Sequence, residues 1–332
     1  MGIASMSRLR PDEPRPALSG TGRLPIVVVS YDQQTYWLMI RMYSTILAPV
    51  DGSGGSNGAV IRTLAFARKF GATVHVLHVV EAKTGPAGLD RTQRERIRRP
   101  FEKWGRRATA RIQERASELG IDVTRTVHEG VPYRIILEYA DEHDIDLIVM
   151  GTHGRTGAER VALGSTTERV ITLADSPVLA VPLTDEDGAD IDSIEYARVV
   201  IATDGSDVAE RAAERGIEIA EAYDSEVCVA YVIDTMTYNL EDSPRSIIGL
   251  LKQGGQNAVG AIAAEGRDRG LSVGTDVLRG VPHDEIIEYV DEVGGDIVVL
   301  GTRGRGGAAG DLIGSTTARV LRRTSHPILT VG

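Results

Sequence analysis

The sequence has a single cysteine, Cys228, among its 332 residues. One cysteine excludes a disulfide within the chain and a metal site made of several thiolates, and it suits a reducing compartment. Aromatic residues are also few, at 5%, whereas hydrophobic residues together reach 42% and charged residues 25%. These proportions are ordinary for a globular protein. We therefore expect a core of aliphatic side chains and a cytoplasmic location.

Long apolar runs are missing as well. The nearest approach, residues 26–29 and then 37–40, is interrupted by Asp32 and two glutamines, whereas crossing a bilayer needs roughly 20 apolar residues. The start of the chain also lacks the apolar region of a secretion signal. We expect no membrane partner. A strand-like run follows Met42, which predicts that residues 1–41 are an extension, either disordered or not native.

An excess of basic charge is absent too. The formal net charge is −10, and the isoelectric point is near 5.3. General binders of nucleic acid concentrate lysine and arginine, because these side chains displace counterions from the phosphates. We therefore expect no nucleic-acid partner.

The sequence repeats itself at a nearly constant offset. Gly130-Val131-Pro132 returns 150 residues later as Gly280-Val281-Pro282, whereas Asp51-Gly52-Ser53 matches Asp204-Gly205-Ser206 at an offset of 153. Copies of this size indicate a duplicated domain, because solenoid repeats are much shorter. An acidic stretch without apolar periodicity separates the copies. We predict one domain over residues 42–184, a linker over 185–194 and a second domain over 195–332.

Each copy predicts five short strands that alternate with helical patterns. Helical spacing is clear in Ile61–Arg68 and Ile135–Ala140, where apolar residues recur three and four apart. Apolar strands separated by helix-length connections predict parallel pairing and helices on both faces. The expected fold is α/β, with two tandem doubly wound domains that each hold a five-stranded parallel sheet. The predicted strands are residues 45–50, 73–80, 122–128, 147–150 and 178–181, and then 199–202, 226–233, 272–278, 297–300 and 328–331.

The carboxyl ends of the strands are the expected ligand site, because open α/β sheets bind ligands where their strand order reverses. The first strand of each copy ends in an acidic turn, Asp51-Gly52-Ser53 or Asp204-Gly205-Ser206. The aspartate can accept hydrogen bonds from ribose or adenine. Alternatively, the aspartate or serine only caps the following helix.

A glycine pattern follows the fourth strand of each copy. Gly151-Thr152-His153-Gly154, nine residues and Gly164-Ser165-Thr166 return as Gly301-Thr302-Arg303-Gly304, nine residues and Gly314-Ser315-Thr316. Glycine lets the backbone approach phosphate oxygens, and the amides that start the next helix attract an anion. The pattern is neither a Walker A loop nor a dinucleotide fingerprint. An arginine follows the second glycine of each loop and is either a phosphate contact or a solvated side chain: Arg155 and Arg305.

These two motifs together resemble those of the universal stress protein family, in its tandem form. The resemblance covers both copies and implies the strand order 3-2-1-4-5. It implies binding of ATP or AMP, with Mg²⁺ as a possible companion ion. It also implies pairing of the last strands of the two copies as an intramolecular pseudo-dimer, with a homodimer as an option. The implied nucleotide-binding residues are Pro49, Val50, Asp51, Ser53, Val79, Met150, Gly151, Gly154, Arg155, Gly164, Ser165 and Thr166, and then Ala202, Thr203, Asp204, Ser206, Val232, Leu300, Gly301, Gly304, Arg305, Gly314, Ser315 and Thr316.

Three functions stay open on this basis. The leading one is a nucleotide-binding stress-response or regulatory protein that acts through a conformational change or a protein partner. The first alternative is an ATP-hydrolysing or adenylate-forming enzyme, because Ser53-Gly54-Gly55-Ser56 is similar to the loop of related enzymes. Copy two has Ser206-Asp207-Val208-Ala209 instead, and no catalytic residue is predicted. The second alternative is a dimerisation scaffold that binds no nucleotide.

Other chemistry-bearing residues receive structural interpretations. His75, His78 and His128 fall in predicted strands without the spacing of a metal site, so we expect packed or edge residues and no metal. The segment Arg94–Arg107 is strongly basic and contains Trp104. It is interpreted as a solvated helix or a lobe over the nucleotide, and a contact with a partner or a nucleic acid is the alternative.

Overall fold

The computed structural model describes residues 42–81, 90–153, 163–183, 190–238, 245–305 and 313–332. The predicted extension over residues 1–41 lies outside the described residues, as do Gly154 and Arg155. All described residues belong to one compact unit, Arg41–Gly332. The elements of the first half are β1 (Thr45–Pro49), α2 (Gly54–Phe70), β2 (Thr73–Glu81), α3 (Arg91–Glu118), β3 (Val123–Gly130), α4 (Pro132–Glu142), β4 (Leu147–Gly151), α5 (Ser165–Leu173) and β5 (Val178–Val181).

The second half repeats this order. A short 3-10 turn, η1 (Ile191–Ser193), precedes it. The side chain of Ile191 is buried and belongs to the core, so this part of the predicted linker packs on the protein. The elements that follow are β6 (Arg198–Thr203), α6 (Asp207–Tyr223), β7 (Glu226–Asp234), α7 (Thr235–Tyr238), α8 (Arg245–Asp268), β8 (Val273–Gly280), α9 (Pro282–Val293), β9 (Ile297–Gly301), α10 (Ser315–Arg323) and β10 (Ile328–Val331).

The helix boundaries follow local sequence signals. Asp90 starts α3 with a capping box, in which its carboxylate accepts from the amide of Gln93 and the Gln93 side chain accepts from the amide of Asp90. Proline opens both α4 and α9, where its missing N–H would have no helical partner. Gly71 ends α2 in the left-handed conformation that favours glycine. The proline start is common to both halves, whereas the capping box of α3 and the glycine end of α2 belong to the first half.

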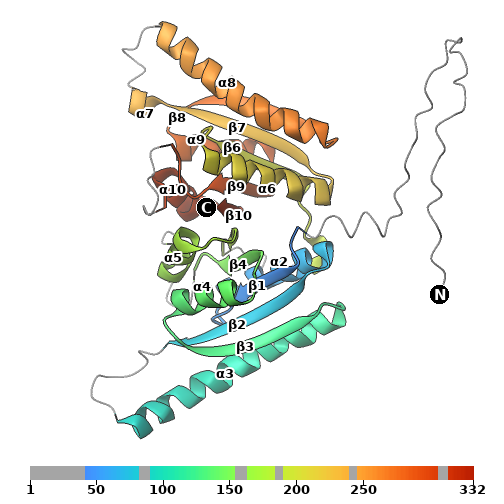
Figure 1. The fold of residues 1–332 in the computed structure, drawn as a ribbon, viewed down its shortest axis with the longest axis vertical. Coiled ribbons are helices and arrows are strands. Elements are labelled where there is room, and N and C mark those ends of the chain that lie inside the picture. The colour runs from blue at the N-terminus through green and yellow to red at the C-terminus, as the bar shows by residue number, and fades with distance from the viewer. Residues whose placement is uncertain (1–41, 82–89, 154–162, 184–189, 239–244, 306–312) are drawn as a thin grey trace, which may run out of the picture. The chain divides into compact units, whose positions relative to one another are not determined.

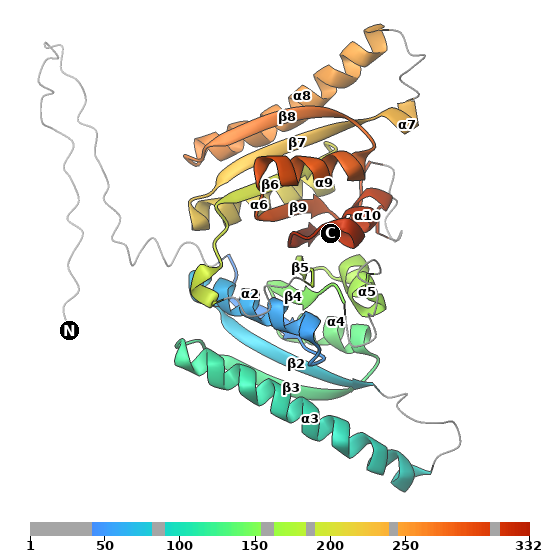
Figure 2. The ribbon, with the colours of Figure 1, turned by 180° about the vertical axis from the view of Figure 1, so that it is seen from behind.

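All ten strands form one sheet in the order β3-β2-β1-β4-β5-β10-β9-β6-β7-β8. Each half therefore has the expected order 3-2-1-4-5, and all strand pairs within a half are parallel. The two halves join through β5 and β10, which pair antiparallel with Leu179 opposite Leu329. The predicted fold is confirmed, with the two predicted sheets continuous as one. Figures 1 and 2 show the strands between their covering helices.

The core lies on both faces of the sheet. Helices α2, α3, α6 and α8 contribute to one layer of buried side chains, and α4, α5, α9 and α10 contribute to the other. The central strands β4, β5, β9 and β10 bury nearly all their side chains, whereas the edge strands β3 and β8 have no fully buried residue. The strand order reverses between β1 and β4 in the first half and between β6 and β9 in the second, so the carboxyl ends of these strands are the expected ligand sites.

An aromatic cluster also joins the halves on one side of the sheet. The ring of Phe66 on α2 lies 5.5 Å from that of Tyr196 and 5.9 Å from that of Tyr223, which ends α6. Phe70 and Tyr43 extend the cluster in the first half. Phe66, Tyr43 and Tyr196 are almost completely buried. The halves thus share a core in addition to a strand pair.

Candidate functional site

The strand ends bring the two sequence motifs together at the reversal point of each half. β1 lies between β2 and β4, so the turn after Pro49 is beside the end of β4 at Gly151. In the second half, β6 lies between β7 and β9, and the turn after Thr203 is beside Gly301. This is where doubly wound folds bind their ligands.

The acidic turns are closed by their own aspartates. Asp51 Oδ1 accepts hydrogen bonds from the amide of Ser53 at 2.9 Å and from its hydroxyl at 2.6 Å. Asp204 Oδ1 accepts from the amide of Ser206 at 3.0 Å. The glycine between each aspartate and serine has a positive φ, +69° at Gly52 and +71° at Gly205, which this tight turn requires. Each carboxylate is half-buried and is fixed at the end of its strand.

The capping interpretation holds for one serine only. The hydroxyl of Ser206 accepts from the amide of Ala209 and caps α6, whereas Ser53 makes no such bond to α2. Neither Asp51 nor Asp204 is the cap residue of the following helix. The aspartates therefore shape the turn and do not cap a helix.

The described parts of the glycine loops have the same hydrogen bonds in both halves. The Gly164 amide donates to the Thr152 carbonyl at 2.8 Å, and the hydroxyl of Thr167 donates to the Gly151 carbonyl at 2.8 Å. The second half repeats both bonds at 2.8 Å with Gly314, Thr302, Thr317 and Gly301. The amides of Gly164 and Gly314 are thus already used. Among the described residues of the two loops, the backbone donors that remain for an anion begin with Ser165 and Ser315.

Helices α5 and α10 start at this point without a side-chain cap. Their N-cap residues are Gly164 and Gly314, and neither N-cap makes a side-chain hydrogen bond. Ser165 and Ser315 are exposed, and Thr166 and Thr316 are half-buried. The first amides of a helix carry partial positive charge and have no helical partner, so an uncapped start suits an anion.

Apolar side chains form a wall beside each strand end. Val79 on β2 and Val232 on β7 are partly buried and pack against the core layer that contains buried Met150 on β4 and buried Leu300 on β9. These four belong to the same core layer as α4, α5, α9 and α10. Of the other predicted residues, Val50, Ala202 and Thr203 are buried, and Pro49 is half-buried.

In the second half, the glycine loop reaches across to the acidic turn. The Arg305 amide donates to Asp204 Oδ2 at 2.8 Å, and Arg305 Nη2 lies 3.4 Å from the Gly205 carbonyl. A Cβ at Gly304 would lie 2.5 Å from Asp204 Oδ2, so only glycine fits between the two motifs. Arg305 therefore lies over the acidic turn.

In the first half, a tryptophan covers the corresponding turn. The Trp104 indole on α3 contacts Gly52 so closely that a Cβ on this glycine would collide with it. Trp104 also packs edge-on against buried His78, and His78 Nδ1 lies 2.8 Å from the Val50 carbonyl. His78 is thus a packed residue, as predicted.

The sequence analysis expected the segment that contains Trp104 to be a solvated helix or a lobe over the nucleotide, but it did not predict the contact of Trp104 with Gly52. The repeat offset of 150 residues aligns Trp104 with Gly254, and a Cβ at Gly254 would meet no atom within 4 Å. The offset of 153 that applies to the second strand aligns His78 with Tyr231. A residue-by-residue comparison of the two copies could therefore have shown that Trp104 and His78 are particular to the first half. The two sites have the same strand ends, but Trp104 covers the turn of the first site and Arg305 covers the turn of the second.

His153 lies at the start of the glycine loop. Its Nδ1 is 2.9 Å from the hydroxyl of Thr152, and burial lowers the pKa of the imidazole. Its Nε2 is buried and has no hydrogen-bond partner within the described ranges. Arg303 replaces it in the second half. In the part of the chain that the structure describes, no three His, Cys, Asp or Glu side chains form a group suited to a metal ion.

Comparison with known proteins matches the two halves of the chain separately. The sequence model of the universal stress protein family matches residues 42–182 and, a second time, residues 195–332. The chain belongs to the universal stress protein family. Within this family, it is 37% identical over 139 residues to a universal stress protein of Methanocaldococcus jannaschii, which covers 41% of this chain and 82% of the relative.

Relatives with both halves also exist in the universal stress protein family. A universal stress protein of Mycolicibacterium smegmatis is 24% identical over 303 residues, which is 86% of this chain and 96% of the relative. The crystal structure of a universal stress protein from Archaeoglobus fulgidus matches with a TM-score of 0.67 at 21% identity, over 87% of this chain and 97% of the other. These matches support the tandem form. Among the described helices, none is long and apolar enough to cross a membrane.

Proposed function

We propose that each half of this protein binds one adenine nucleotide, ATP or AMP, and that the bound state is communicated through a conformational change or a protein partner. The observation that carries the proposal is the pair of uncapped helix starts at α5 and α10, each beside a strand-end carboxylate, Asp51 or Asp204. Anionic phosphates suit the helix starts, and ribose hydroxyls suit the carboxylates. Family membership favours a role in the stress response.

The residues fit the two ends of such a ligand. The apolar wall of Val79 and Met150, or of Val232 and Leu300, suits the base. The buried Nε2 of His153 offers an additional polar contact beside the first loop. Because no group of metal ligands occurs among the described side chains, Mg²⁺ at this site would depend on phosphate oxygens for most of its ligands. The proposal includes a cytoplasmic location, which rests on composition.

Calorimetric titration of nucleotide-free protein with ATP and with AMP tests the proposal. We expect two sites per chain for at least one of these nucleotides. A Gly304→Ala variant should lose the site of the second half, because its Cβ would meet Asp204. Gly260→Ala is the matched control, since a Cβ there meets no atom within 4 Å.

The results also separate the alternatives. Absence of binding to the native protein would reject the nucleotide proposal and favour a scaffold. Release of ADP or AMP at a rate that the Gly304→Ala variant lowers would favour an enzyme.

A further inference from the structure

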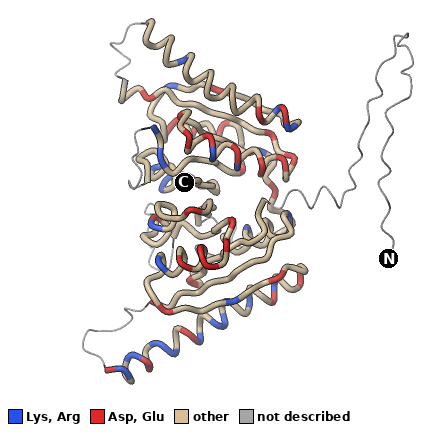
Figure 3. Tube along the Cα trace, viewed as in Figure 1, with Lys and Arg blue, Asp and Glu red and all other residues tan. Residues whose placement is uncertain are grey.

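One side of α3 presents six basic side chains to solvent. Ten basic and four acidic residues give Arg91–Glu118 a formal charge of +6. The outward residues recur three and four apart, which places them along one side of the helix. All are exposed, and we call them the basic face: Arg96, Arg99, Lys103, Arg106, Arg107 and Arg111. Figure 3 shows Lys and Arg along this helix.

The opposite side of α3 faces the protein. Gly105, Thr109 and Ala116 are buried there, and α3 packs against β2 and the edge strand β3. The basic face is therefore directed away from the sheet, and it does not contribute to the core.

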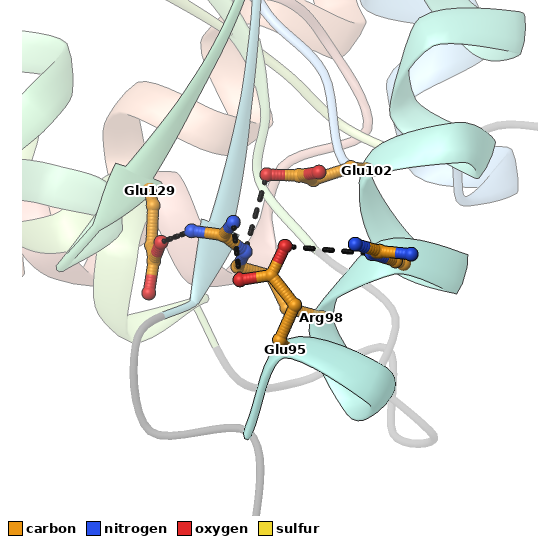
Figure 4. A network of polar contacts seen from close by, with 5 residues as sticks. Glu95, Arg98, Glu102 and Glu129 are labelled. Atoms are coloured by element: carbon orange, nitrogen blue, oxygen red, sulfur yellow. Dashed lines mark hydrogen bonds and ion pairs between the residues drawn. The ribbon is translucent and has the colours of Figure 1, made fainter. Parts of the chain in front are cut away.

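The nearby glutamates do not neutralise the basic face. Glu95, Glu102 and Glu129 surround Arg98, with N–O distances of 3.1, 3.3 and 2.6 Å (Figure 4). Glu95 also pairs with Arg99 at 3.4 Å. This network ties α3 to the end of β3 and engages these three glutamates. The side chains of the other five members of the basic face have no ion pair or hydrogen bond within the described ranges.

The duplicate helix lacks the basic face. At the offset of 150 residues, α8 carries six uncharged residues at the same positions, all exposed: Ser246, Gly249, Gln253, Gln256, Asn257 and Ala261. Both helices cover the same two strands of their half. The fold therefore does not require these charges, and they have been placed on one half only.

We propose that the basic face binds an acidic segment of a partner protein. The distance from Arg96 to Arg111 along the helix is about 22 Å, which an extended segment of about seven residues can follow. The chain outside α3 has a formal charge of −16, because the whole chain carries −10 and α3 carries +6. A nucleic acid or an anionic membrane would extend beyond the basic face and meet this acidic remainder. A short carboxylate-rich segment is confined to the face.

The test uses the full-length protein and a fluorescent peptide of about ten residues with alternating glutamate and glycine. We expect binding that weakens roughly tenfold between about 50 and about 200 mM salt, since exposed charges are screened. A variant that copies α8, with R96S, K103Q, R106Q, R107N and R111A, should reduce binding at least about tenfold. Its helix should persist, because α8 is helical with the same residues.

The matched control introduces the basic residues of α3 at the corresponding positions of α8. The changes S246R, Q253K, Q256R, N257R and A261R should give α8 a second binding site and raise the stoichiometry from one peptide to two. Failure of the native protein to bind the peptide, or unchanged binding by the copied variant, overturns the proposal. Tighter binding of a single-stranded RNA or of vesicles with anionic lipid than of the peptide also overturns it.

Discussion

Trp104 lies against Gly52, so that a side chain of α3 covers the turn that holds Asp51. The second half has Gly254 in place of this tryptophan and covers its turn with Arg305 from the glycine loop. Two sites with the same strands thus have different covers, and this difference can be tested separately from nucleotide binding.

Gly52→Ala should destabilise the protein more than Gly71→Ala. Both glycines have a positive φ, +69° and +65°, so alanine costs about 1–2 kcal/mol at either place. At Gly52 the new methyl group also collides with Trp104, which adds about 1–3 kcal/mol of overpacking. At Gly71 it meets no atom within 4 Å. Urea unfolding measures the difference, and equal losses would contradict the close packing of Trp104.

Removal of the Trp104 indole should relieve its collision with the methyl group of Gly52→Ala. Adding Trp104→Ala to Gly52→Ala should recover part of the stability that the single glycine change loses, because two residues in contact are energetically coupled. A double-mutant cycle measures this coupling. Additive losses would show that the indole does not contact Gly52 in solution.

Nucleotide binding to the first half should change the fluorescence of Trp104. The chain has two tryptophans, so Trp37→Phe leaves Trp104 as the single reporter. ATP or AMP near Asp51 should alter the surroundings of the indole that covers this turn. The response should persist in the Gly304→Ala variant, whose change lies in the second half. An unchanged spectrum at saturating nucleotide would place Trp104 outside the site.

Acid should destabilise the protein partly through His75. Burial and the neighbouring imidazole of His143 lower the pKa of His75 below its ordinary value of 6.5. Its Nδ1 lies 2.9 Å from the Tyr139 hydroxyl. The unfolded chain therefore takes up the proton first, and stability falls as the pH drops below about 6.5 toward the lower pKa of the folded state.

The histidine is tested by unfolding experiments between about pH 7 and pH 5. His75→Gln should flatten the loss of stability over this range. His128→Gln, on the exposed edge strand β3, controls for removal of a histidine. An unchanged slope in the His75→Gln variant would contradict the expected role.

The two halves should unfold in one transition. Phe66 contacts Tyr196 and Tyr223 of the second half and is completely buried. Phe66→Ala should cost about 3–5 kcal/mol by leaving a cavity, and it should shift the whole transition. Calorimetry and denaturant unfolding measure this. Two separate transitions in the native protein would contradict the shared core.

The fold could be predicted from the sequence because the copies repeat strong local signals. The predicted strand over residues 178–181 has the bounds of β5, and most other strands differ by one or two residues. Apolar runs such as Leu147–Met150 are buried on both faces, so their composition identifies them as central strands of the sheet. The strand order and the pairing of β5 with β10 came from family resemblance, because strand order depends on contacts distant in sequence.

The site could be predicted only in part. The motifs predicted which strand ends meet, because Asp51 and Gly151 each follow a buried strand at the reversal point. They did not predict that the amide of Gly164 is bonded to Thr152, since this depends on the path of the loop. They also did not predict that Trp104 contacts Gly52, because α3 is far from this turn in the sequence and its basic residues indicated only a solvated helix or a lobe over the nucleotide.

The antiparallel contact of β5 with β10 has an evolutionary consequence. When two identical subunits associate, every substitution appears on both sides of their boundary. In this chain, both sides are encoded separately, and covalent connection keeps them together at any dilution. The two sides can therefore differ: the first half has an indole and an arginine-rich helix, and the second has glycine and uncharged residues at the same positions.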